Sequence, residues 1–393
     1  MNLPLHGFGA VAGGWPNLPL KALSLREALA LEYPLQRVAV LVGPHENVAD
    51  TTLRAIGAAA VVRGEPEVET GLPTLSRLSA DGLLNSGDVF RVRPDNGRVS
   101  VLYRRGANAN SLLVTERCNS PCLMCSQPPR PEDDGWLIGE LRDIIPLIDQ
   151  DLPSLGLTGG EPTLLGERLA ELLALARQWL PNTGIHILSN GRTFSDPRAC
   201  ESFDGTQQQV TWGIPLYGAV PWRHDHIVQA RGAFDQTISG LLNLAERGHA
   251  VEIRVVLHRL TADHLFEIAG FIQRCLPFAI HVAFMGLEPM GYAKMNRELL
   301  WIDPIDLAPA LTEAIEHLDI HGIRASIYNL PLCLLPAGLR RFARQSISDW
   351  KNVFDAACSD CVARAHCCGF FASTGPAWRS RGLKPLSIEE FVR

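Results

Sequence analysis

The chain has 393 residues, 46% of them hydrophobic and 20% charged, a balance typical of globular proteins with roughly two or three domains. Its net charge of −6 excludes an overall basic field for nucleic acid. The N-terminus lacks a signal-peptide pattern and no apolar run is long enough to cross a bilayer, so we expect a cytoplasmic protein with no membrane partner. In that reducing compartment its ten cysteines favour metal ligation or packing over disulfides.

Residues 1–107 are predicted to form an N-terminal, β-rich α+β domain. The stretch RVAVLVGP (37–44) is typical of a strand. The stretch DVFRVRPDNGRVSVLYRR (88–105) predicts a β-hairpin, because its arms alternate apolar and polar residues and Pro94-Asp95-Asn96-Gly97 supplies the turn.

Residues 108–330 repeat a pattern of strand, loop and helix. The spacing of apolar residues predicts amphipathic helices within 137–148, 165–176 and 234–245. Strands are predicted at 112–115, 155–158, 185–189, 209–214, 251–257, 279–285 and 323–327. This alternation indicates an α/β fold with a parallel sheet. Roughly six or seven strands favour a partial (β/α)6 TIM-like barrel over a closed barrel of eight.

Loops at 118–125, 159–162 and 189–191 follow the first three strands, at the end of a βα barrel where reactive loops lie. The first loop, CNSPCLMC, spaces Cys118, Cys122 and Cys125 as C-x3-C-x2-C. A structural zinc site usually has four ligands, and no histidine lies in this stretch. Thiolates also hold iron–sulfur clusters, normally one per iron, so three would leave one iron open to a small chelating molecule.

This cysteine motif after the first strand, with Gly159-Gly160-Glu161-Pro162 after the second, resembles the radical S-adenosylmethionine (SAM) superfamily. The resemblance implies a [4Fe–4S] cluster on Cys118, Cys122 and Cys125 whose open iron binds SAM. It further implies that reductive cleavage of SAM gives methionine and a 5′-deoxyadenosyl radical, which abstracts a hydrogen atom from the substrate. Taken alone, the GGEP stretch would be an ordinary strand-end turn.

The resemblance also implies cofactor contacts from the loops and strands that follow. Gly159, Gly160 and Glu161 would face the methionine amino group, Ser189 and Asn190 the methionyl and ribose parts, Arg254 the carboxylate, and Met124 and Met285 the adenine. The alternative for Ser189, Asn190 and Arg254 is that they are ordinary loop and strand residues.

A second group of cysteines lies in residues 331–393. The spacing Cys358-x2-Cys361-x5-Cys367 resembles the auxiliary-cluster extensions called SPASM or twitch domains, with Cys333 as a fourth ligand. Cys368 is the substitute for Cys367. There are too few cysteines for the full SPASM pattern, so the resemblance implies one auxiliary [4Fe–4S] cluster, and a four-thiolate zinc knot is the alternative.

Four stretches together resemble the radical SAM maturase of the His-Xaa-Ser peptide-modification system. They are CNSPCLMCSQPP, GLTGGEPTL, FMGLEPMGYAKMN (284–296), and SISDWKNVF followed by CxxCxxxxxCCGFF. The resemblance implies a peptide or protein substrate with His-Xaa-Ser repeats, a paired second radical SAM maturase, and a flavodoxin or ferredoxin electron donor. The N-terminal domain would recognise the peptide, by adding it as a strand to an exposed sheet edge.

Two other functions remain open. One is radical SAM chemistry on a small molecule or an RNA base, and the other is a non-catalytic iron–sulfur or zinc module. Several residues also keep two interpretations. Glu288, Tyr292 and Lys294 either face substrate or belong to a solvated loop, Tyr217 either meets substrate or packs, and 223–226 (RHDH) either binds metal or opens a helix.

Overall fold

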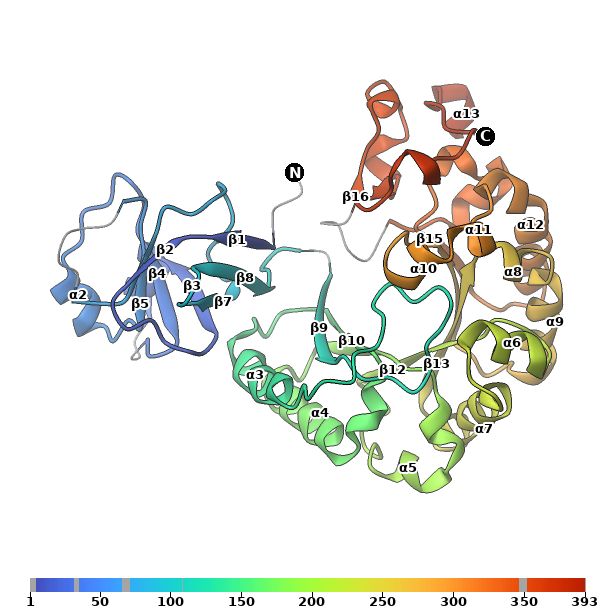
Figure 1. The fold of residues 1–393 in the computed structure, drawn as a ribbon, viewed down its shortest axis with the longest axis horizontal. Coiled ribbons are helices and arrows are strands. Elements are labelled where there is room, and N and C mark those ends of the chain that lie inside the picture. Colours follow the sequence, from blue (N-terminus) through green and yellow to red (C-terminus); the bar gives the residue numbers. More distant parts are fainter. Residues whose placement is uncertain (1–4, 32–34, 66–70, 108, 346–351, 393) are drawn as a thin grey trace. The chain divides into compact units, whose positions relative to one another are not determined.

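The computed structural model describes residues 5–31, 35–65, 71–107, 109–345 and 352–392 (Figure 1). Most of the SISDWKNVF stretch therefore lies outside the described residues. The chain divides into two compact units, each described by itself below. The first comprises Met1–Leu112, Gly135–Leu155 and Glu171–Thr183, and the second comprises Leu113–Asp134, Gly156–Ala170 and Gly184–Arg393.

The first unit contains an eight-stranded mixed sheet with the order β1-β8-β7-β3-β4-β5-β6-β2. Its strands are β1 (His6–Phe8), β2 (Ala10–Ala12), β3 (Leu20–Ser24), β4 (Val38–Leu41), β5 (Ala60–Val62), β6 (Thr74–Ser76), β7 (Val89–Arg93) and β8 (Arg98–Tyr103). β4 confirms the predicted strand, and the antiparallel pair β7–β8 confirms the hairpin. Gly97 turns this hairpin with φ +65°, a conformation that favours glycine.

One short segment pairs with both ends of this sheet. β1 pairs with β8, and β2, which follows after a single residue, pairs with β6. β8 and β6 lie next to the two ends of the strand order, so residues 6–12 occupy both edge positions. A peptide that added a strand to this sheet would therefore have to pair with β1 or β2, which form its two edges.

Alternate side chains of β3 and β4 enter two apolar clusters on opposite faces of the sheet. Leu20 and Ala39 pack in the cluster that contains Trp15 and Phe90. Leu23 and Val40 pack in the second cluster, with Leu53 of α2 (Asp50–Ala55) and Ala28 of α1 (Leu25–Ala30). The two-sided burial explains why β4 is an almost continuous apolar run in the sequence.

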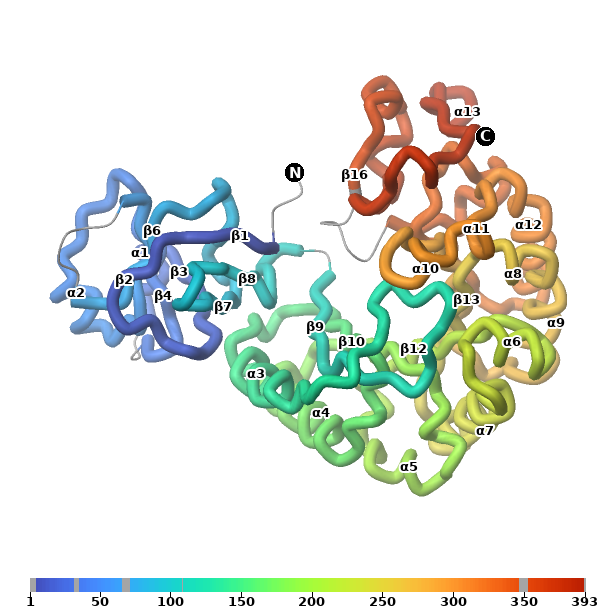
Figure 2. The backbone as a smooth tube through the Cα atoms, in the orientation of Figure 1, coloured from blue at the N-terminus to red at the C-terminus, as the bar shows by residue number. Residues whose placement is uncertain are grey.

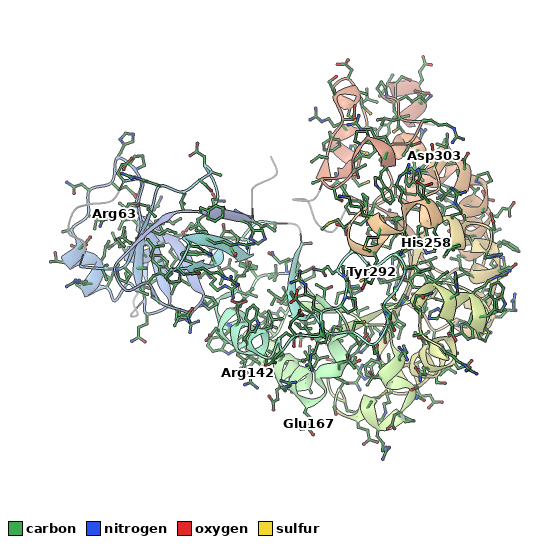
Figure 3. The ribbon with its side chains drawn as sticks, viewed as in Figure 1. Arg63, Arg142, Glu167, His258, Tyr292 and Asp303 are labelled. Carbon is green, nitrogen blue, oxygen red and sulfur yellow. The ribbon has the colours of Figure 1, made fainter. Side chains whose placement is uncertain are left out.

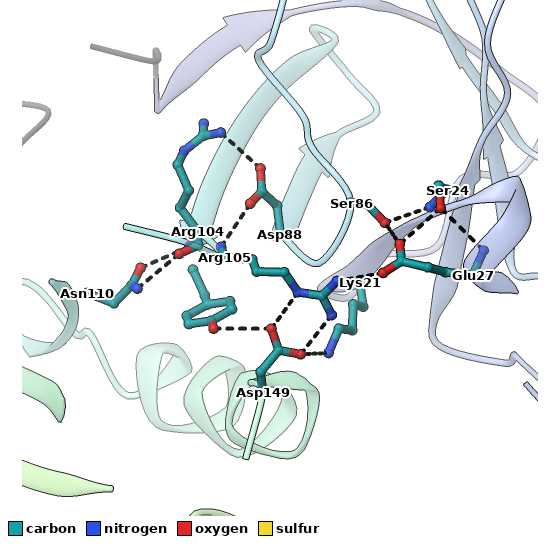
Figure 4. Close-up of polar contacts among 10 residues, drawn as sticks. Lys21, Ser24, Glu27, Ser86, Asp88, Arg104, Arg105, Asn110 and Asp149 are labelled. Atoms are coloured by element: carbon teal, nitrogen blue, oxygen red, sulfur yellow. Dashed lines mark hydrogen bonds and ion pairs between the residues drawn. The ribbon is translucent and has the colours of Figure 1, made fainter. Parts of the chain in front are cut away.

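Ion pairs attach the stretch Gly135–Leu155 to the sheet of the first unit. Asp149 accepts hydrogen bonds from Lys21 Nζ at 2.5 Å, from Arg105 Nε and Nη2 at 2.6 and 2.9 Å, and from the Tyr103 hydroxyl at 3.3 Å (Figure 4). Helix α3 (Trp136–Ile144) adds the pairs Arg91–Glu140 and Arg37–Asp143. The predicted amphipathic helix therefore carries a charged face that binds the sheet.

The larger sheet has seven strands in the order β15-β14-β13-β12-β11-β10-β9. They are β9 (Asn110–Thr115), β10 (Ser154–Gly159), β11 (Gly184–Leu188), β12 (Val210–Pro215), β13 (Ala250–Leu257), β14 (His281–Gly286) and β15 (Ala325–Tyr328). The ladders from β11 to β15 are parallel. The predicted α/β barrel class is confirmed, with seven strands in place of six, and Figure 2 shows the chain curving through successive strand–helix units.

The helices that accompany these strands vary widely in length. They are α4 (Glu167–Trp179), α5 (Pro197–Glu201), α6 (Pro221–Val228), α7 (Ala233–Glu246), α8 (Arg259–Ala262), α9 (Leu265–Cys275), α10 (Gly291–Met295), α11 (Arg297–Leu300) and α12 (Pro304–Ile320). In β13, buried and partly exposed residues alternate strictly along the strand. The buried set, Val251, Ile253, Val255 and Leu257, faces the helices, so the partly exposed set faces the interior of the barrel.

The C-terminal part of the second unit consists of short turns, the strand pair β16 (Asn352–Val353) and β17 (Phe370–Phe371), and α13 (Ile388–Val392). Asp303, labelled in Figure 3, is the N-cap of α12. It anchors this part by accepting hydrogen bonds from Ser380 Oγ at 2.5 Å and Arg381 N at 3.0 Å. In the described part of the chain, no helix combines the length and apolar character needed to span a membrane.

Candidate functional site

The three predicted cluster ligands lie on the loop that follows β9. The Sγ atoms of Cys118 and Cys122 donate to the carbonyl oxygen of Ser120, at 3.5 and 3.7 Å. Cys125 Sγ donates to the Gln127 carbonyl at 2.9 Å. All ten cysteines are free thiols. The loop therefore presents three unpaired sulfur donors within a few residues of one another.

The glycine turn after β10 packs directly against the start of this cysteine loop. Gly160 N donates to the Thr115 carbonyl and Glu161 N to the Arg117 carbonyl, both at 2.8 Å. A Cβ atom on Gly159 would lie 2.2 Å from the Thr115 carbonyl oxygen, and one on Gly160 would lie 2.1 Å from that of Arg117. Glycine is thus required here by close approach to the loop's own backbone.

Glu161 ties the second loop to the third. Its side chain is fully buried and accepts hydrogen bonds from Thr163 N (3.0 Å), Thr163 Oγ1 (2.6 Å), Ser189 Oγ (2.8 Å) and Asn190 N (2.6 Å). Burial raises the pKa of this carboxyl, and the four hydrogen bonds oppose that rise. In this structure both carboxylate oxygens of Glu161 are occupied by protein donors, and its contact with the cofactor stays a prediction.

The loop after β11 holds the first half of the cysteine loop. Asn190 Nδ2 donates to Asn119 Oδ1 at 2.6 Å. Arg192 Nη1 donates to the Asn119 carbonyl at 2.6 Å and to Ser120 Oγ at 2.9 Å. The structure therefore brings the predicted residue Asn190 to the loop that carries the cysteines, and Ser189 to Glu161 beside it. It adds Arg192, which the sequence did not single out.

Met124 lies below the loop rather than on its surface. It is 6% exposed and packs in an apolar cluster with Tyr217, Ile227 and Val228. Tyr217 stacks on His224 with ring centroids 5.8 Å apart, and His224 Nδ1 accepts the Tyr217 backbone N–H at 3.3 Å. The stretch 223–226 thus belongs to α6, which confirms the prediction of a helix start.

Burial governs the protonation of the three thiols. It raises the pKa of Cys118 to about 11 and that of Cys122 to about 12, and it also raises the pKa of Cys125. The thiols are therefore neutral near pH 7, and a metal centre bound to them must displace their protons. In the parts of the chain that the structure describes, no three His, Cys, Asp or Glu side chains are gathered for a single metal ion. Three free cysteines on one loop match the three thiolate ligands that the sequence pattern predicts, one fewer than a tetrahedral structural zinc site usually has.

Arg254 and Met285 meet in the interior of the barrel. Arg254 Nη2 donates to Met285 Sδ at 3.6 Å, and its Nη1 donates to Glu252 Oε1 at 2.7 Å. Gly213 makes room for this arrangement, because a Cβ there would lie 3.0 Å from Arg254 Cδ and 2.9 Å from His186 Cε1. The two predicted cofactor residues are thus neighbours on adjacent strands.

A partly buried polar network that the sequence analysis missed continues from Arg254. Glu252 Oε2 lies 2.8 Å from His281 Nδ1, and His281 Nε2 lies 3.0 Å from Ser326 Oγ. His186 Nε2 lies 3.3 Å from Glu252 Oε1. Burial alone would raise the Glu252 pKa, but the neighbouring His186, the hydrogen bond with His281 and the Arg254 charge hold it well below its usual range.

The signal for this network was present in the sequence. Strands of a parallel sheet are normally apolar on both faces. Here IHIL and VEIRVVL carry polar residues at positions that alternate with the buried ones, and RASIY places Ser326 between Ala325 and Ile327. Such alternation in a barrel strand indicates a polar interior open to water, in contrast to a packed core of branched side chains.

The second cysteine group gathers around a small apolar cluster of Leu332, Ala363 and Leu386. Cys333, Cys361 and Cys367 pack against these three residues, and Cys358 lies close enough to influence the Cys333 thiol electrostatically. Backbone N–H groups point at the sulfurs: Leu332 N and Gly369 N donate to Cys367 Sγ at 3.4 Å each, and Leu386 N donates to Cys361 Sγ at 3.3 Å. Such donors favour thiolates over thiols.

Cys367 and Cys368 differ sharply in environment. A hydrogen bond from Cys368, with those from Gly369 and Leu332, lowers the pKa of Cys367 to about 6 in spite of burial. The same contact with Cys367, followed by burial, raises the pKa of Cys368 well above its usual value. Cys368 is only 4% exposed. These environments favour Cys367 as the fourth thiolate, as its spacing predicts.

A sequence-family model described as the Radical SAM superfamily matches residues 112–272. The choline trimethylamine-lyase activating enzyme of Oleidesulfovibrio alaskensis is 26% identical over 215 residues, covering 51% of this chain and 66% of the relative. The GTP 3′,8-cyclase of Desulforamulus reducens is 25% identical over 195 residues, covering 48% and 58%. Among solved structures, Streptococcus suis SuiB bound to S-adenosylmethionine is 15% identical and covers 56% of this chain and 51% of SuiB, with a TM-score of 0.44.

The matched segment begins within β9 and contains β10 to β13 together with the cysteine loop and the glycine turn. The similarity to the Radical SAM superfamily therefore lies in residues 112–272, which make up less than half of the chain. The matches span less than two thirds of the length of each of the two curated relatives.

Proposed function

We propose that this protein is a radical SAM enzyme that reductively cleaves S-adenosylmethionine and modifies a peptide or protein. One observation carries the proposal: three free thiols lie on one loop, and the Gly159-Gly160-Glu161 turn is hydrogen-bonded to that loop's backbone. Cys118, Cys122 and Cys125 would hold the [4Fe–4S] cluster. When bound, the cluster supplies the electron that cleaves the sulfonium of SAM to methionine and the 5′-deoxyadenosyl radical.

The chain's own residues prepare the site for this chemistry. Glu161, with its four hydrogen bonds, fixes the loops after β10 and β11 relative to each other. Among the residues that the structure describes, Arg254 Nη2 donates only to the weak acceptor Met285 Sδ, so it can donate to a carboxylate in the barrel. Partly buried walls lower the local dielectric constant, which strengthens such contacts.

The substrate we propose is a protein with His-Xaa-Ser repeats, modified together with a second radical SAM maturase in the cytoplasm. Flavodoxin or ferredoxin would supply the electron. The sequence motifs support this assignment, since FMGLEPMGYAKMN and the C-terminal cysteines lie outside the segment common to the superfamily. The first unit, with its separate mixed sheet, would recognise the peptide.

Cys333, Cys358, Cys361 and Cys367 would hold a second, auxiliary [4Fe–4S] cluster. Three backbone N–H donors aimed at Cys361 and Cys367 support thiolate ligation there. With four protein ligands this cluster would have no open iron, so it would carry electrons or support the fold.

A second candidate function is radical chemistry on a small molecule. The polar interior network of Glu252, His281, His186 and Ser326 favours it, because such groups can bind a small polar substrate. One curated relative is named a GTP 3′,8-cyclase, and this name gives a small molecule as that relative's substrate.

Anaerobic reconstitution with iron and sulfide, reduction, and addition of SAM test the proposal. We expect 5′-deoxyadenosine, and its loss in Cys122→Ala but not in Cys275→Ala, which removes an exposed thiol outside both groups. About eight irons per chain would support two clusters and about four would support one. Mass spectrometry after incubation with the His-Xaa-Ser protein tests the substrate, and an unchanged mass despite SAM cleavage contradicts that assignment.

A further inference from the structure

Residues 290–296, here called the clasp, follow β14 and include α10. The clasp lies beside the cysteine loop, with Tyr292 labelled in Figure 3. Tyr292 N donates to the Cys125 carbonyl at 2.8 Å. Asn296 Nδ2 donates to the Leu123 carbonyl at 2.8 Å, across a separation of 173 residues in the sequence. Two ordinary hydrogen bonds therefore join the clasp to the second half of the loop.

Gly291 allows this close approach. Its φ of +52° lies in the left-handed region, and a Cβ there would be 2.6 Å from the Cys125 carbonyl oxygen and 2.7 Å from that of Ser126. Any other residue would strain the backbone and push it off the loop. The glycine in the GYAKMN stretch is thus explained by contact with the loop that carries Cys125.

The clasp is anchored on one side and open to water on the other. Ala293 is fully buried in the apolar cluster that contains Met124 and Tyr217. On the outer side, Met290 is 43% and Met295 77% exposed. The inward contacts of the clasp are therefore with the cysteine loop and the apolar side chains beneath it.

The two halves of the cysteine loop are held by different elements. Arg192 and Asn190 bind Asn119 and Ser120 in the first half. In the second half, Leu123 N donates to the Ile227 carbonyl at 2.9 Å, and the clasp binds the carbonyls of Leu123 and Cys125. Loss of the clasp would therefore loosen the half with Cys125 and leave the first half in place.

We propose that Asn296 is a positioning residue for the cluster-binding loop, because it fixes the backbone between Cys122 and Cys125. This proposal rests on the proposed function in one respect only, the identification of the loop as the one that holds the iron–sulfur cluster. The Leu123 carbonyl accepts a hydrogen bond from the Asn296 carboxamide, and it would lose this donor if the carboxamide were replaced. The geometry therefore points to a need for the N–H donor itself, in addition to the bulk of the side chain.

The variant Asn296→Asp tests this, because it keeps the size and removes the donor. Asn243→Asp is the matched control: Asn243 Nδ2 also donates to a backbone carbonyl, that of Phe194, at 2.8 Å. In metal-free full-length protein we expect the amides of residues 123–126 to exchange hydrogen on the order of fivefold faster in N296D, the factor that one ordinary hydrogen bond is worth. We expect no change there in N243D. Equal exchange in wild type and N296D would overturn the proposal.

A second readout follows the cluster itself. Electron paramagnetic resonance of the reduced, reconstituted protein should show a changed signal in N296D and a response to SAM that needs at least about fivefold more SAM, with N243D like wild type. An N296D signal and SAM response equal to those of N243D would overturn the proposal. If wild type itself gives no response to SAM, the proposed function fails, while the exchange experiment still decides the role of Asn296.

Discussion

Replacing Glu252 with glutamine should destabilise the barrel by about 2 kcal/mol. The Glu252 side chain is 13% exposed and that of Arg254 15%, and Arg254 Nη1 lies 2.7 Å from Glu252 Oε1. Breaking a fully buried ion pair costs about 3–5 kcal/mol, and partial exposure reduces that cost. The glutamine also loses one acceptor, so the hydrogen bond with His281 is weakened.

The pH dependence gives a sharper test of the same substitution. Because the Glu252 pKa is held below the ordinary value of 4.5, the charged carboxylate favours the folded state. The stabilisation by the charged carboxylate is fully present above pH 4.5, the ordinary pKa of a glutamate. It is lost as the pH falls from there through the lower pKa of Glu252 in the folded state. We therefore expect the stability difference between wild type and Glu252→Gln to be constant from about pH 7 to about pH 5 and to shrink in stronger acid.

The assay is urea unfolding followed by tryptophan fluorescence across this pH range. Glu246→Gln is the control, because Glu246 is exposed on α7 and its change should alter stability by less than about 0.5 kcal/mol. Equal stability of Glu252→Gln and wild type at neutral pH would refute the reasoning, as would a difference that grows in acid.

Three further predictions concern other parts of the chain. Gly160→Ala should displace the cysteine loop and lower stability by about 1–3 kcal/mol, with reduced iron binding after reconstitution, because its Cβ would lie 2.1 Å from the Arg117 carbonyl; full iron content would contradict this. Asp149→Asn should lower the melting temperature of the first unit, since it weakens the pairs with Lys21 and Arg105; an unchanged calorimetric transition would count against it. Cys367→Ala should lose the second cluster's iron and Cys368→Ala should retain it, as measured by iron analysis; the opposite pattern would assign Cys368 as the ligand.

The repeat of strands and helices could be predicted because local periodicity determines it. Predicted strands at 185–189 and 251–257 match β11 (Gly184–Leu188) and β13 (Ala250–Leu257) to within one residue at each end. β1 and β2 could not be predicted, since HGFGAVA carries no alternation and forms strands only through its partners β8 and β6. Pairing between distant segments decided that part of the sheet.

The candidate site also contains some features that the sequence could predict and others that it could not. The cysteine spacing and the paired glycines are local patterns, so the sequence could locate them. The bond from Asn296 to Leu123 and the contact of Glu252 with His281 join residues far apart in the chain. The register of β13 and β14 brings Glu252 to His281, and the packing of the clasp on the cysteine loop brings Asn296 to Leu123. The sequence carries no local sign of which partner each will meet.

The most direct test of the central claim is the release of 5′-deoxyadenosine by the reduced, anaerobically reconstituted full-length protein supplied with S-adenosylmethionine. We expect release by wild type and its loss in Cys122→Ala, with Cys275→Ala like wild type. A wild-type protein that binds about four or more irons per chain and releases no 5′-deoxyadenosine would contradict it.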